Sequence, residues 1–243
     1  MTESHIARLR RLASVIAIGT PILLAGFAIG GAATNASVID TARASAVCVM
    51  LLLACVIFAP LSFDLPRVDK RRGFVVFWFI VSAFFNATWQ IPLIVFRSTI
   101  TTAEPTHENL RKFIAWWGYG FADSHYGRVT TWMMAEELWW LLAIALSVYG
   151  LVLLRRGREP LAFVLLGVAG ALESYNASLY IVENWLVDGF GNIADGSVLS
   201  QILYWGFNPL WAFAAGLASY FSFRFVLDRL DRAESAAVAA ETR

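Results

Sequence analysis

Residues 161–184 read LAFVLLGVAGALESYNASLYIVEN, an apolar run that is interrupted by carboxylates and amides. A membrane-spanning helix needs about 20 largely apolar residues, so this run is long enough to cross a bilayer. Its polar residues include Glu173, Asn176, Tyr180 and Glu183. Steps of three, four and three residues place these on one helical face. A polar face is costly against lipid, so we expect it to face inward in a helical bundle.

The whole chain has the composition of a membrane protein. Of its 243 residues 58% are hydrophobic and 15% are charged, and the mean hydropathy is +0.62. A soluble domain is roughly half apolar and about a quarter charged. Further runs long enough to span a bilayer lie at about 13–34, 44–63, 74–96, 131–154 and 200–224. We therefore predict one all-α polytopic domain over residues 1–243 with six transmembrane helices. The net charge of +1 gives no sign of nucleic-acid binding.

The basic residues predict the orientation of the spans. Lys and Arg are enriched in cytoplasmic loops. This chain has 19 Lys and Arg residues. Of these, 14 lie before the first span, after the last span, or in the two alternate loops that share their side of the membrane: Arg8, Arg10, Arg11, Arg67, Lys70, Arg71, Arg72, Arg155, Arg156, Arg158, Arg224, Arg229, Arg232 and Arg243. Both termini are thus expected in the cytoplasm, with residues 228–243 as a tail. Lysine is rare, which is typical of GC-rich bacterial genomes, so we expect a bacterial plasma membrane.

The first run, 13–34, has two interpretations. Basic residues precede it and alanines end it, as in a signal peptide. Its apolar stretch is long for a signal peptide, and we favour an uncleaved helix. Removal of the run would leave the later loops with the same charge pattern, so charge does not decide between the two.

Several polar residues in the other spans define a candidate pocket. Glu136 and Glu137 are adjacent, so their side chains point about 100° apart and only one is expected to face a cavity squarely. Asn208 precedes Pro209, which removes a backbone donor. Ionisable groups at membrane depth are costly and mark candidate functional sites. Asn176 and Tyr180 have the simpler alternative of hydrogen bonding between helices.

An apolar pocket that contains an acid and tryptophans suits carbocation chemistry. A carboxyl group removed from water tends to keep its proton, and a protonated carboxyl facing an alkene is a general acid. Tryptophan faces attract cations, and exclusion of water protects a cation from quenching. These properties predict proton-initiated alkene chemistry on a membrane lipid. The three histidines show no metal-ligand spacing, so we expect neither a metal nor a cofactor.

Four short motifs follow one another along the chain: Trp116-x-x-Tyr119-x-x-x-Asp123-Ser124-x-Tyr126, Tyr175-x-x-x-Leu179-Tyr180, Asp188-Gly189-Phe190 and Asn208-x-Leu210-Trp211. Together they resemble the emopamil-binding protein family of sterol delta-8 to delta-7 isomerases. Glu137 follows Asp123 by fourteen residues, which is the family's spacing to its helix glutamate. The motifs keep their order over about residues 70–227.

The resemblance implies the EXPERA fold, a five-helix core placed here at residues 44–227, with 13–34 as an extra N-terminal helix. It implies isomerisation of a C=C bond in a sterol-like or terpenoid lipid. Glu137, rather than Glu136, would face the cavity as acid or base, and Glu173 would be a relocated acid. The residues expected to bind substrate are Asn86, Gln90, Asp123, Trp140, Asn176, Tyr180, Asn208 and Trp211. Cationic amphiphiles are expected to bind as mimics of the carbocation.

The chain departs from the family at two positions. The isomerases carry His-x-x-x-Glu where this chain has Asn86 and Gln90, and amides do not readily exchange protons. This departure leaves open a non-catalytic sterol- or lipid-binding protein. A weaker similarity leaves open an integral-membrane terpene cyclase, because residues 86–90 resemble that family's N-x-x-W-E segment. Gln90 replaces the acid of that family as well.

The charge pattern makes a prediction that reporter fusions can test. Fusions after residues 70 and 157 should report the cytoplasm, and a fusion after residue 110 should report the external side, because basic loops are retained inside. An external signal at residue 157 would contradict the six-span orientation.

Overall fold

The described part of the protein is a bundle of helices. The computed structural model describes residues 3–128, 131–194 and 196–241. The helices, in chain order, are α1 (Glu3–Thr34), α2 (Val38–Ile57), α3 (Ala59–Ser62), α4 (Arg67–Phe85), the π-helix η1 (Asn86–Gln90), α5 (Ile91–Thr102), α6 (His107–Gly120), α7 (Ser124–Arg128), α8 (Thr131–Arg155), α9 (Glu159–Asp188) and α10 (Val198–Glu241). Six stretches are long and apolar enough to cross a membrane. This confirms the predicted class, an all-α polytopic bundle in the membrane.

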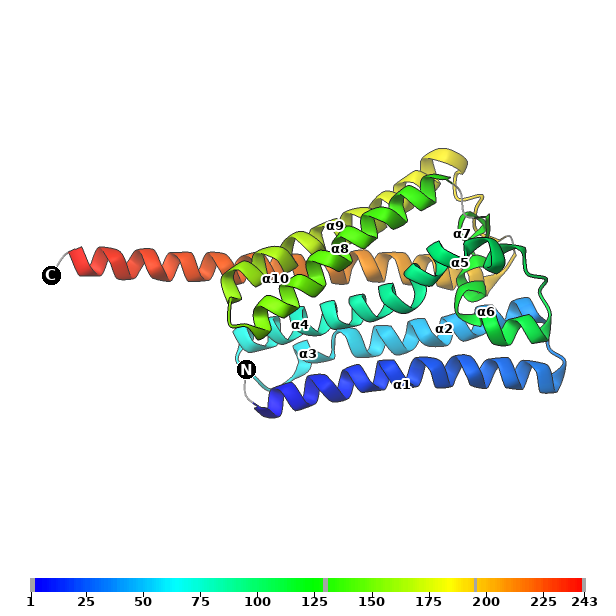
Figure 1. Cartoon of the computed structure of the whole chain (residues 1–243), viewed down its shortest axis with the longest axis horizontal. Helices are drawn as coiled ribbons and strands as arrows, with labels where there is room; N and C mark the ends of the chain where they lie inside the picture. The colour runs from blue at the N-terminus through cyan, green and yellow to red at the C-terminus, as the bar shows by residue number, and fades with distance from the viewer. Residues whose placement is uncertain (1–2, 129–130, 195, 242–243) are drawn as a thin grey trace.

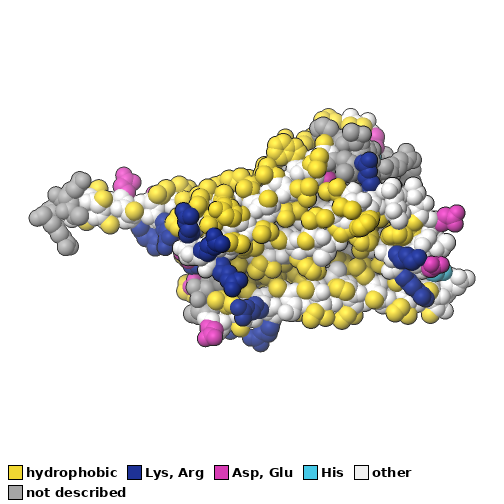
Figure 2. Space-filling view, viewed as in Figure 1, with side chains coloured by type: hydrophobic (Ala, Val, Ile, Leu, Met, Phe, Trp, Pro, Cys, Tyr) yellow, Lys and Arg dark blue, Asp and Glu magenta, His cyan; other side chains and the backbone are white. Residues whose placement is uncertain are grey.

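The six spans run along one direction, with α1 and α2 on one side of the bundle and α8 and α9 on the other (Figure 1). The chain begins and ends at the same end of the bundle, and the short helices α6 and α7 lie at the opposite end (Figure 1). Basic side chains gather at the end that carries the termini, and an apolar belt covers the visible middle (Figure 2). This is the surface that a protein spanning a bilayer requires.

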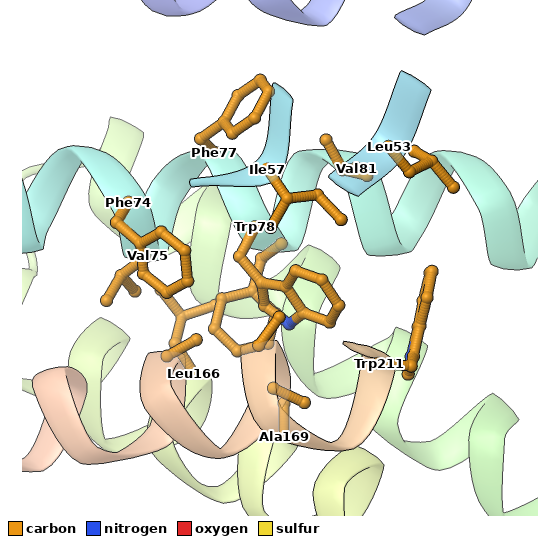
Figure 3. Close-up of a cluster of buried hydrophobic side chains, with 14 of the residues drawn as sticks. Leu53, Ile57, Phe74, Val75, Phe77, Trp78, Val81, Leu166, Ala169 and Trp211 are labelled. Carbon is orange, nitrogen blue, oxygen red and sulfur yellow. The ribbon is translucent and has the colours of Figure 1, made fainter. Parts of the chain in front are cut away.

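The core lies between α2, α4, α9 and α10. Trp78 of α4 is fully buried and packs against Leu166 and Ala169 of α9 and against Trp211 of α10 (Figure 3). The rings of Trp78 and Trp211 meet edge to face, with centroids 4.9 Å apart. Such aromatic pairs add about 0.5–1.5 kcal/mol beyond the area they bury. This cluster fixes Trp211 at the inner edge of the apolar core.

The span predicted as one helix at 74–96 is instead interrupted by η1. The backbone N–H of Ile91 donates to the carbonyl of Asn86, five residues back, which widens this turn. Pro92 has no N–H to continue the α-helical pattern, which is consistent with an irregular turn here. The wide turn buries both Asn86 and Gln90, while Thr88 stays exposed. Single π turns of this kind occur frequently at functional sites.

The expected tail at 228–243 is helical in its described part. Helix α10 continues from the membrane-spanning region to Glu241, and residues 231–239 are exposed. The extension projects beyond the rest of the bundle (Figure 1). We expected the last span to end near residue 224. The helix itself continues through the alanine-rich segment, because alanine has the highest helix propensity.

Helices α9 and α10 pack closely at Gly170, which predicts a specific loss of stability. A Cβ there would lie 2.8 Å from the carbonyl oxygen of Ala215 and 3.0 Å from the backbone nitrogen of Ser219. Gly170→Val should lower the free energy of unfolding by about 1–3 kcal/mol, measured by thermal denaturation in detergent. Gly26→Val is the matched control, because a Cβ on Gly26 meets nothing within 4 Å. An equal loss in both variants would contradict this packing.

Candidate functional site

A cavity of about 310 Å³ opens inside the bundle. All six spans contribute to its wall, and α6 and α7 close it with Tyr119 and Tyr126. The wall is mainly apolar and aromatic, as in ligand-binding cavities, with a small number of polar side chains. Seven of the ten predicted site residues line it: Asn86, Gln90, Trp140, Asn176, Tyr180, Asn208 and Trp211. The remaining three, which are all acids, lie behind the wall.

Glu136, and not Glu137 as predicted, lines the cavity. The structure places Glu136 in the wall, one helical turn from Trp140, and Glu137 behind it. Both side chains are buried. The hydroxyl of Tyr126 donates to Glu137 Oε1 at 3.2 Å, so Glu137 is linked to the cavity through a residue of the wall. The difference follows from the rotation of about 100° between neighbours on a helix.

Glu173 is connected to the cavity through two other side chains. It is fully buried, and its carboxylate accepts from Ser82 Oγ at 2.6 Å and from Trp78 Nε1 at 3.1 Å. Asn86 Nδ2 donates to the same Ser82 hydroxyl at 3.0 Å, and Asn86 lines the cavity. Burial of a carboxyl group is costly unless donors replace water. Glu173 therefore lies outside the lining of the cavity and holds Ser82, which accepts from Asn86.

Asp123 joins the two loops at the α6 end of the bundle. It accepts from Tyr180 Oη at 2.6 Å, from Asn192 Nδ2 at 2.9 Å and from the backbone N–H of His125 at 3.0 Å. A β-bridge pairs it with Ile193. Tyr180 lines the cavity, so Asp123 positions a wall residue from behind. Burial raises the pKa of Asp123 above the usual value of an aspartate, against the effect of its three donors.

Three asparagines of the wall are oriented in the same way. Asn176 Nδ2 donates to the carbonyl of Glu136 at 3.4 Å, and Asn208 Nδ2 donates to Tyr119 Oη at 2.6 Å. Asn86 donates to Ser82, as described above. Each amide is held in place by an N–H that it donates to the protein, and its carbonyl oxygen can serve as an acceptor for a bound molecule. The wall can thus receive a hydroxyl or an ammonium group.

Some polar atoms of wall residues are buried without a hydrogen-bond partner in the described part of the chain. They include Thr20 Oγ1, Gln90 Oε1 and Trp211 Nε1. Leaving a buried donor or acceptor unsatisfied costs about 1–3 kcal/mol. A polar group brought into the cavity could recover part of this cost after small side-chain movements.

Trp211 is the centre of an aromatic cluster beside the cavity. Its ring stacks on Phe207 at a centroid distance of 5.7 Å and meets Trp140 and Phe85 edge to face, each at 6.2 Å. These rings, together with Trp78, surround Trp211 on several sides. Aromatic faces arranged in this way can stabilise a positive charge on a bound molecule.

Sequence reasoning missed several wall residues. Tyr119 and Tyr126 stand within the loop motif, and that motif was the signal that could have identified them. Phe207, one residue before Asn208, also lines the cavity. Thr20, Pro21 and Leu24 of α1 line it as well, although nothing in the sequence of the first span linked it to the pocket.

Comparisons with protein-family models, with curated proteins and with solved structures find no match to this chain. Within the described residues, no group of three or more His, Cys, Asp or Glu side chains could hold a metal ion. The described wall offers carboxyl, phenol and amide groups beside aromatic rings.

The burial of Asp123 predicts that the free energy of unfolding depends on pH. Because the pKa of Asp123 is raised on folding, its stabilising contribution is fully present below about pH 4 and is lost as the pH rises through the raised pKa. Asp123→Asn should therefore cost more free energy of unfolding at about pH 4 than at about pH 8. Thermal denaturation at both pH values measures this difference.

Asp40→Asn serves as the control, because the Asp40 side chain is 66% exposed. The change with pH in the cost of Asp123→Asn should exceed the change seen for this exposed aspartate. If the loss of unfolding free energy caused by Asp123→Asn increased with pH, the three donors would lower the pKa of Asp123 more than burial raises it.

Proposed function

We propose that this protein is a member of the emopamil-binding family that binds a sterol-like or terpenoid lipid in the cavity and moves a C=C bond in it. The observation that carries the proposal is the position of Glu136, a carboxyl group in the wall of an apolar cavity beside Trp140 and Trp211. A carboxyl group in a mainly apolar and aromatic wall can act as a general acid toward an alkene in the bound lipid.

The wall supports binding of a large apolar molecule with a single polar group. Its aromatic and aliphatic side chains match a ring system or a polyprenyl chain, and the carbonyl oxygens of Asn86, Asn176 and Asn208 can accept from a hydroxyl. The same acceptors and rings suit the ammonium group of a cationic amphiphile. We extend the proposal to such amphiphiles as ligands.

Glu136 would act as the acid of the reaction. Its carboxyl proton is transferred to one alkene carbon, which leaves a carboxylate and a carbocation on the neighbouring carbon. Loss of a proton from the next carbon then forms the double bond in its new position, so no atom is gained overall. The indoles of Trp140 and Trp211 stabilise the cation between the two steps.

The second proton transfer has two acceptors within the site. The carboxylate of Glu136 can take the proton, or the Tyr126 hydroxyl can take it while passing its own proton to Glu137. Proton transfer of this kind by a positioned side chain contributes about 10²–10⁴-fold to a rate. Glu173 would contribute by holding Ser82 and Asn86 in place.

A non-catalytic lipid-binding protein is the second candidate, and one observation favours it. Asn86 and Gln90 occupy the π-turn where the isomerase family has histidine and glutamate, and neither amide can relay a proton. For the same reason, delta-8 sterols should be bound without efficient conversion.

Turnover in D₂O separates the two candidates. The lipid that co-purifies with the protein is returned to it in nanodiscs in D₂O, and the products are analysed by mass spectrometry. We expect the migrated product to carry one deuterium, because the added proton comes from an exchangeable group. Glu136→Gln should lower the rate by about 10²-fold or more.

Glu108→Gln is the control for this experiment, because Glu108 is an exposed acid on α6, outside the cavity. Its rate should equal that of the unmodified protein. Retention of the lipid with no deuterium gain would favour a non-catalytic lipid-binding protein. Efficient conversion of an added delta-8 sterol would contradict the proposal that Asn86 and Gln90 prevent this reaction.

A further inference from the structure

The N-terminal helix α1 takes part in the cavity that the proposed function uses. Thr20, Pro21 and Leu24 of α1 line it opposite residues of α8, α9 and α10. This participation is unexpected for a helix that the family resemblance treated as an addition to a complete five-helix core. The question is what α1 contributes to the site.

Exposure of the wall residues locates the opening of the cavity. Two of the described wall residues, Pro21 and Thr88, are exposed, whereas the others are buried or half-buried. Pro21 belongs to α1 and Thr88 to η1. The wall of the cavity therefore reaches the surface of the molecule at α1 and at η1.

The opening lies at membrane depth. Pro21 is followed by 13 further residues of α1, and Thr88 by 14 residues of η1 and α5. At 1.5 Å per residue, about 20 Å of helix separates each of them from the end of its span. Both lie within apolar stretches that are long enough to cross a bilayer. The opening thus faces the hydrocarbon of the membrane rather than water.

Both helices are irregular where they border the opening. Pro21 lacks the N–H that would bind the carbonyl of Ala17, which loosens α1 at this turn. On the other side, η1 has the widened π turn. Helices interrupted in this way deform more easily than regular ones, so the gap can widen for a bulky molecule.

A buried hydroxyl lies directly beside the opening. Thr20 Oγ1 is buried and has no hydrogen-bond partner in the described part of the chain. Other helical hydroxyls, such as those of Thr34 and Thr88, donate to the carbonyl four residues back. Thr20 therefore retains the capacity to bind a polar group that passes Pro21.

We infer that α1 and η1 form a lateral portal, through which an apolar molecule with a polar group enters the cavity directly from the bilayer between Pro21 and Thr88. This inference concerns the same cavity as the proposed function, and it names the bilayer as the source of the ligand. It makes the first span a functional part of the site.

Photolabelling tests the portal without requiring either turnover or an identified ligand. The full-length protein in nanodiscs is exposed to an iodophenyl diazirine dissolved in the bilayer, and labelled residues are located by mass spectrometry. Label should appear on Ala177, which lines the cavity and is 6% exposed, and on Tyr175 of the same helix, which is 65% exposed to the exterior. Thr88→Trp should abolish labelling of Ala177 and leave labelling of Tyr175 unchanged.

Pro21→Trp tests the portal from the other helix and should give the same result. Val95→Trp is the matched control, because Val95 is 63% exposed on α5 and does not line the cavity. Unchanged labelling of Ala177 in both portal variants would overturn the inference. Failure of the proposed function would not affect this readout, because the diazirine reports access and not lipid specificity.

Discussion

A carboxyl group at membrane depth needs hydrogen-bond donors, and the architecture of the site depends on this constraint. Glu137 accepts from Tyr126, Glu173 accepts from Ser82 and Trp78, and the loop residue Asp123 accepts from Tyr180. Each donor either lines the cavity or contacts a residue that does. The acids therefore fix the wall from behind, while Glu136 remains as the acid within it.

The π-turn is the second determinant of the site. Within it, Asn86 and Gln90 are buried on the inside of the span, and Thr88 is exposed on the outside. One irregular turn thereby provides amides for the cavity and one side of the proposed portal. Under the proposed function, its two amides are the reason why delta-8 sterols are expected to be bound without efficient conversion.

Much of the fold and part of the site could be predicted from the sequence. The six spans follow from runs of apolar residues, and the inward face of α9 follows from the helical spacing of Glu173, Asn176 and Tyr180. The order of Glu136 and Glu137 could not be predicted, because it depends on the rotation of α8 about its axis. The π-turn depends on tertiary packing beside Pro92, and the part played by α1 depends on which face of an almost uniformly apolar helix meets the bundle.

The central claim is that the cavity holds one class of lipid, an unsaturated molecule with a sterol-like or terpenoid skeleton and a hydroxyl group. Lipid analysis of the purified protein by mass spectrometry tests it directly, in comparison with Ala177→Phe, which fills the cavity, and Tyr175→Phe, which changes an exterior residue. The account predicts one such lipid enriched over the bulk membrane in the unmodified protein and in Tyr175→Phe, and absent from Ala177→Phe. The same lipid composition in all three proteins would contradict it.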